Sequence, residues 1–309
     1  MIPAFRISDA LRGIVFHELK GPNLACSRRD HFRSPGFGSV SLWKDALIHH
    51  QDRVTKVWRD GPRLGAAGSA RICGGPKVWE LDHLYLRGAD SSLDLEEESY
   101  PALLDSLVQS ARERGAERVF LTCLAESQVS RIAQRAGFFR YFNESLLEHD
   151  GSGVIPARDD RSIPALIRDR LPQDTHGLFQ LFSAATPQRV RTGLGFTLDQ
   201  WRDAQPPRHG REWVACHNDR LTGWAALWDL GAESIGEVMI HPDHPELLPE
   251  MLGLVFDRPG PQRWMVPDYQ ETFMGSLFER GFQETVEYAI LAKTVAVQKF
   301  SHGMAAVEV

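Results

Sequence analysis

The feature that most constrains this chain is an order of strand and helix patterns that occurs twice along its length. In the first half, two strand-like runs at 53–59 and 64–73 flank Asp60-Gly61-Pro62, which is a hairpin turn signal. The patterns that follow are a half-buried strand, an amphipathic helix, a strand, a short helix and further strand material, at 77–86, 99–115, 117–124, 127–136 and 138–149. This succession is typical of a mixed sheet covered by helices.

The second half repeats this order with shorter loops. Its patterns are a hairpin, a strand, a helix, a strand, a short helix and a final strand, at 211–228, 234–240, 247–255, 262–266, 272–280 and 286–297. The short helix of each copy ends at a Gly-Phe pair, Gly137-Phe138 or Gly281-Phe282. We therefore predict an α/β (α+β) chain of two tandem domains, each a twisted mixed sheet flanked by helices. The predicted segments are domains over 1–150 and 173–300, a linker over 151–172 and a tail over 301–309.

Composition narrows the class of partner. Lys and Arg number 35 against 41 Asp and Glu, a net charge of −6 with both signs interspersed, which disfavours a nucleic-acid ligand. No apolar run approaches the roughly 18 residues of a membrane span. Arg6 and Asp9 place charges where a secretory signal would have its apolar segment, so we expect no such signal. The four cysteines lie far apart, so we expect reduced thiols, no metal site and a cytoplasmic location. Trp224 and Trp228 are interpreted as core or domain-interface residues.

The repeated order resembles the GNAT superfamily of N-acetyltransferases, here in tandem. Residues 79–86 and 235–242 look like the fourth strand of that family, and the two short helices that end at the Gly-Phe pairs look like its Gly-Phe corner. The resemblance covers about 53–150 and 211–297. It implies acetyl-CoA as co-substrate, with the pantetheine arm between the fourth and fifth strands. The diphosphate would lie at the start of the next helix, where unpaired N–H groups attract anions.

The resemblance also implies where the functional residues lie. The positions implied for the cofactor are Leu84, Tyr85, Leu86, Ser91, Ser92, Val238, Met239 and Ile240. Glu80, Asp82 and Glu237 are the candidate carboxylates for deprotonating an amine, and Tyr85 is the candidate acid for the leaving thiolate. The alternative is that the carboxylates pair with nearby arginines and that Tyr85 packs against a helix.

Two departures from the family pattern leave two functions open. The loop after Leu86 is acidic with a single glycine, the loop after Ile240 has no glycine, and the usual tyrosine positions hold Ala133 and Leu277. The first hypothesis is an acyl-CoA-dependent N-acyltransferase, in particular an N-acetyltransferase, that acts on a small amine or an amino-terminal group. The alternative is a catalytically degenerate pair of domains that binds a small molecule or a protein. The sequence leaves open which copy is active and whether the chain forms oligomers.

Overall fold

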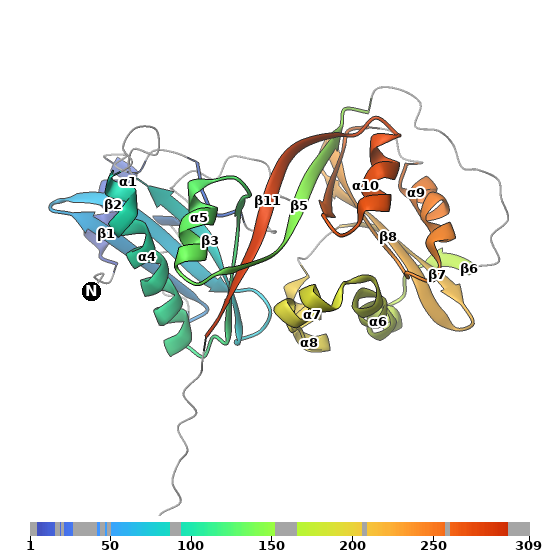
Figure 1. Cartoon of the computed structure of the whole chain (residues 1–309), viewed down its shortest axis with the longest axis horizontal. Helices are drawn as coiled ribbons and strands as arrows, with labels where there is room; N and C mark the ends of the chain where they lie inside the picture. The colour runs from blue at the N-terminus through green and yellow to red at the C-terminus, as the bar shows by residue number, and fades with distance from the viewer. Residues whose placement is uncertain are drawn as a thin grey trace, which may run out of the picture.

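The described strands form one continuous mixed sheet. The computed structural model describes residues 5–15, 19, 22–26, 42–43, 47, 51–86, 94–151, 166–205, 209–256 and 260–295. Within these residues the sheet has eleven strands, in the order β1-β2-β3-β4-β11-β5-β10-β9-β8-β7-β6. Figure 1 shows two lobes, each with helices against its part of the sheet. No described helix is long and apolar enough to cross a membrane.

The first half follows the predicted order. After α1 (Ile7–Val15), its elements are β1 (Arg53–Asp60), β2 (Arg63–Ile72), β3 (Val78–Leu86), α4 (Asp94–Glu113), β4 (Arg118–Leu124), α5 (Gln128–Arg135) and β5 (Phe139–His149). The hairpin turn is made at Gly61, whose positive φ of 56° is a conformation that glycine adopts without steric cost. The strand material after the first Gly-Phe pair is a single strand.

The second half contains the predicted repeat together with additional elements. Its elements are β6 (Leu166–Asp169), the 3₁₀ turn η1 (Pro172–Asp174), α6 (Thr175–Ala185), α7 (Gln188–Leu194), α8 (Leu198–Ala204), β7 (Gly210–His217), β8 (Arg220–Leu230), β9 (Glu233–Ile240), the 3₁₀ turn η2 (Pro245–Leu247), α9 (Leu248–Phe256), β10 (Gln262–Pro267), α10 (Glu271–Phe278) and β11 (Gln283–Thr294). Strand β6 lies wholly inside the stretch 151–172 that the sequence assigned to the linker. It pairs antiparallel with β7 and is four residues long, too short to show an alternating pattern.

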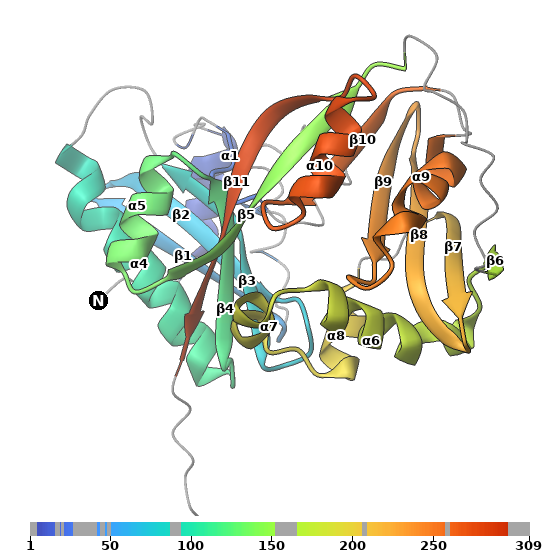
Figure 2. The same cartoon turned by 45° about the vertical axis from the view of Figure 1, so that its right-hand side comes forward.

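The two halves exchange their last strands. Strand β11 lies between β4 and β5 of the first half, so that Ile290 pairs with both Thr122 and Phe142. Strand β5 in turn lies between β11 and β10, where Leu147 pairs with Trp264. Figures 1 and 2 show β11 and β5 crossing between the lobes side by side. Each half of the sheet is therefore completed by a strand from the other half of the chain.

Alternation along β7, β8 and β9 gives the second half two packed layers. Side chains on one face of these strands, among them Trp213, Ala225 and Val238, pack with α9 and α10 in one apolar cluster. Side chains on the opposite face, among them Val214 and Trp224, pack with α6 and α8 in a second cluster. The second face, beneath α6 and α8, carries the cavity described below.

Candidate active site

In each half, two neighbouring parallel strands separate after a short paired stretch. Strands β3 and β4 pair only as far as Leu81 and Leu121, although β3 continues to Leu86. Strands β9 and β10 pair only as far as Gly236 and Trp264, and β9 continues to Ile240. Both halves therefore contain the V-shaped gap between the fourth and fifth strands that the resemblance implied.

The gap of the first half is bridged by the chain itself. Residues Asn23–Cys26 lie across it: the Leu24 amide donates to the Leu84 carbonyl at 2.9 Å, and the Cys26 amide donates to the Thr122 carbonyl at 2.7 Å. The Asn23 side chain accepts from the Leu84 amide at 2.8 Å and donates to the Asp82 carbonyl at 2.7 Å. The main-chain groups that the sequence assigned to a pantetheine arm at Leu84 are thus used by this segment.

The candidate carboxylates of the first half belong to a buried ion-pair network. Glu80 accepts from Arg71 at 2.7 Å, and the fully buried Asp82 lies 2.8 Å from Arg53 Nη1 and 2.6 Å from Ser69 Oγ. Burial by itself would raise the pKa of Asp82. The hydrogen bond and charge of His83 and the guanidinium groups of Arg53 and Arg71 outweigh burial and lower the pKa to about 2. Asp82 is therefore held ionised, which suits an ion pair better than a proton acceptor.

The remaining candidates of the first half do not form a site with them. Tyr85 is only 1% exposed and packs with Leu42 and Trp43 in an apolar cluster, which is the alternative that the sequence left open. Leu86 ends β3 half-buried against the core. Ser91 and Ser92 lie outside the described residues. Their assignment to the cofactor site stays a prediction.

The gap of the second half differs because its strand edge faces a groove. The His241 amide donates to the Thr222 carbonyl of β8. Successive residues of an antiparallel strand direct their main-chain N–H and C=O groups alternately to the two sides of the strand. Since His241 bonds to β8, the main-chain groups of Met239 also face β8, and those of Val238 and Ile240 face the gap. The indole of Trp264 lies against Gly236, where a Cβ atom would fall within its ring. The absence of a side chain at Gly236 thus permits the close approach at which the strands begin to separate.

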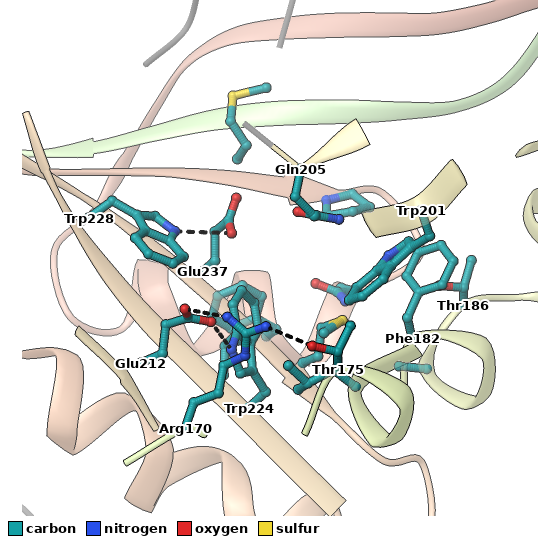
Figure 3. Close-up of a pocket in the computed structure, with 18 of the residues that line it drawn as sticks. Arg170, Thr175, Phe182, Thr186, Trp201, Gln205, Glu212, Trp224, Trp228 and Glu237 are labelled. Carbon is teal, nitrogen blue, oxygen red and sulfur yellow. Dashed lines mark hydrogen bonds and ion pairs between the residues drawn. The ribbon is translucent and has the colours of Figure 1, made fainter. Parts of the chain in front are cut away.

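Two adjoining cavities of about 320 Å³ each lie on either side of this gap. They share Ala185, Val238, Tyr269, Gln270 and Phe273. One extends along η2 towards the start of α9 and is lined by His241 and Leu248. The other lies over the floor of β7–β9, beneath α6 and α8 (Figure 3). We call the first the loop-side cavity and the second the aromatic cavity.

The floor of the aromatic cavity carries two carboxylates that are fixed by tryptophans. Glu212 accepts from the indole of Trp224 at 2.9 Å and from Arg170 at 2.7 Å. Glu237 accepts from the indole of Trp228 at 3.2 Å (Figure 3). The interpretation of the two tryptophans as core and domain-interface residues is therefore incomplete. They are four residues apart on one strand, so they share one face, and that face lines a cavity.

Tyr269 is a residue that the sequence analysis did not single out. It follows β10, lines both cavities, and packs edge-on against Phe142 of β5 with ring centroids 5.6 Å apart. The position four residues before Gly281, where the usual tyrosine was expected, is Leu277, which is fully buried in the core. Tyr269 instead lies in the loop between β10 and α10, outside the position that the family pattern indicates.

The loop after β9 has most of its main-chain donors engaged. The amides of five residues donate to the chain nearby: His241, Asp243, His244, Leu247 and Leu248. Three imidazoles stand at this loop, with the ring of His244 5.1 Å from His217 and 5.9 Å from His241. No three His, Cys, Asp or Glu side chains within the described ranges are arranged to hold a metal ion.

Comparison with known proteins identifies the fold. No family model matches the sequence, and no curated protein matches it. Among solved structures, a GCN5-related N-acetyltransferase from Sphaerobacter thermophilus is similar over 95% of both chains, with a TM-score of 0.55 and 15% identity. A tandem GNAT protein from the clavulanic acid biosynthesis pathway is similar over 95% of this chain and 97% of its own, with a TM-score of 0.51 and 13% identity. The chain therefore has the tandem GNAT fold.

Proposed function

We propose that this chain is an acyl-CoA-dependent N-acyltransferase with one cofactor site, located between β9 and β10, and that acetyl-CoA is its acyl donor. The observation that carries the proposal is the contrast between the two gaps. The first is bridged by Asn23–Cys26, whereas the second has main-chain groups of Val238 and Ile240 turned towards adjoining cavities. The acceptor is a small amine or an amino-terminal group.

The residues around the second gap suit the chemistry of the transfer. Main-chain groups of Val238 and Ile240 would bind the pantetheine arm as an added strand. Glu237, adjacent to the gap, would accept a proton from the acceptor ammonium group, which leaves a neutral amine to attack the thioester carbon. As the N–C bond forms and the C–S bond breaks, the Tyr269 hydroxyl would donate a proton to the leaving thiolate. The attacking nitrogen would then give up its second proton, which restores the Tyr269 hydroxyl, so that the products are the amide and the free thiol.

The alternative function is a binding module that carries out no transfer. The specific observation in its favour is the loop after β9, whose amides are engaged and which contains no glycine. A CoA diphosphate would have to be held there by side chains, for which the imidazoles of His241 and His244 are the candidates.

Calorimetry with acetyl-CoA, and with desulfo-CoA as a ligand that cannot transfer, tests the proposal. We expect about one ligand per chain at micromolar strength, or about −8 kcal/mol. Ala185→Trp should abolish binding because Ala185 lines both cavities. Ala184→Trp, on the exposed side of the same helix, should leave binding unchanged. Absence of binding to the unmodified chain would overturn the transferase proposal and favour the binding module.

A further inference from the structure

We propose that the aromatic cavity binds an uncharged, planar aromatic ring system. The assignment of this ring system to the acyl acceptor rests on the proposed function, whereas its binding to the cavity does not. The inference comes from aromatic side chains on two sides of the cavity, together with charged lining residues that balance one another.

Aromatic side chains line the cavity from two sides. Phe182 and Trp201 come from α6 and α8, and their ring centroids are 5.9 Å apart. Trp224 and Trp228 lie 6.5 Å apart on β8, at the floor. Figure 3 shows these two pairs on opposite sides of the cavity. Because aromatic rings pack well in offset and edge-on arrangements, a planar ring between the two pairs makes such contacts on both of its faces.

The polar edges of the floor are already engaged. The indole of Trp224 donates to Glu212 at 2.9 Å, and the indole of Trp228 donates to Glu237 at 3.2 Å. These bonds fix the two indole planes and use their N–H donors. What the tryptophans offer to a ligand is therefore their ring surface and not a hydrogen bond.

The charged side chains of the lining balance one another. Arg170 pairs with Glu212 at 2.7 Å, and Arg202 pairs with Asp199 at 3.1 Å. Among the described lining residues these two arginines stand against two acids, Glu212 and Glu237, so their charges sum to zero. An ion that entered would lose hydration and meet no net opposite charge in return, which favours an uncharged ring system.

The cavity also places such a ring beside the gap between β9 and β10. Tyr269 and Phe273 line both the aromatic cavity and the loop-side cavity, and so does Val238, whose main chain faces the gap. A ring held between the two aromatic pairs is thus next to the strand edge that the proposed function assigns to the pantetheine arm. An acceptor with an aromatic body would be oriented by that body.

Calorimetry on the full chain at neutral pH, with 2-naphthol and its saturated counterpart decahydro-2-naphthol, tests the inference. The two compounds share one carbon skeleton and one hydroxyl group, and only the first is planar and aromatic. We expect 2-naphthol to bind about tenfold more tightly, the ratio for aromatic contacts on two faces. Equal binding of the two compounds, or binding of neither, would overturn the inference.

A second series keeps the ring and changes the charge of its substituent. Tryptophol is neutral, tryptamine is cationic and indole-3-acetate is anionic. We expect tryptophol to bind at least as tightly as either ion, because the lining returns no net charge for the hydration that an ion loses. Tighter binding of either ion would show that the cavity selects charge and would overturn the uncharged class.

Two phenylalanines of α6 provide a matched pair of variants. Phe182 lines the cavity, whereas Phe179 packs against Phe182 and Trp201 in the same apolar cluster and is not among the lining residues. Phe182→Leu should reduce the preference for 2-naphthol to about threefold, and Phe179→Leu should leave it at about tenfold. An unchanged preference in Phe182→Leu, or an equal loss in both variants, would overturn the location of the site. Circular dichroism checks that both variants are folded.

The same preparations separate this inference from the proposed function. Binding of 2-naphthol with the expected preference, but without acetyl-CoA binding, would retain the ring site and overturn the transferase. Acetyl-CoA binding without 2-naphthol binding would retain the transferase and overturn the ring site.

Discussion

At the scale of single residues, Asp82 shows how a charge can be stabilised in the core. Asp82→Asn should destabilise the fold by about 3 kcal/mol, because Arg53 loses its buried partner while Arg71 keeps Glu80. Urea unfolding at neutral pH measures this loss. The matched control is Glu117→Gln, which removes an exposed pair with Lys77 and should cost less than about 1 kcal/mol. Equal losses of unfolding free energy in the two variants would contradict the role of Asp82 as a stabilising buried partner of Arg53.

The same carboxylate predicts a pH dependence. Its pKa is about 2 in the folded chain against an ordinary value of 3.8, so the unfolded state binds the proton more readily. The contribution of Asp82 to stability is therefore fully present above pH 3.8 and is lost as the pH falls through about 2. The stability difference between the wild-type chain and Asp82→Asn should narrow over this acidic window. A difference that stays constant would contradict the lowered pKa.

The thiol of Cys123 is a second residue whose environment determines its chemistry. Burial raises its pKa to about 11, against smaller opposing effects of Ser127, Arg140 and Ser130. We expect no reaction with Ellman's reagent at pH 8 while the chain is folded. Cys123→Ala should leave the native thiol count unchanged and lower the count in denaturant by one. A lower native count in the variant would show that the thiol is accessible.

At the scale of elements, Gly236 determines how closely β9 approaches Trp264. Gly236→Ala should destabilise the chain by about 1 to 3 kcal/mol, because the added methyl group displaces the indole from the core. Thermal unfolding and tryptophan fluorescence measure the effect. Gly275→Ala in α10, which has open space at the same atom, is the matched control and should be neutral or slightly stabilising. A neutral Gly236→Ala would show that the close approach is dispensable.

The elements also show why some of this structure follows from sequence and some does not. The strands and helices of the repeat were predictable because alternation and helical periodicity are local patterns, and Glu237 lies on one of the predicted strands, β9. Alternation indicates which face a strand buries but does not indicate its neighbours, so the position of β11 was not predictable. Asn23 bridges residues 59 and 61 positions away in sequence, and no local pattern reports such a contact.

At the scale of the whole molecule, the exchange of β5 and β11 makes the two halves dependent on each other. We expect chains 1–157 and 158–309, expressed separately, not to fold, because the first lacks the strand between β4 and β5 and the second lacks the strand between β10 and β11. Co-expressed, they should form a one-to-one complex with the circular dichroism of the intact chain. The intact chain should unfold in one cooperative transition, since β11 contributes Ala289 and Leu291 to the apolar core of the first half and β5 contributes Leu147 to that of the second half. A first half that folds alone as a monomer would show that β4 and β5 pair directly, and that the exchange is not what stabilises the sheet.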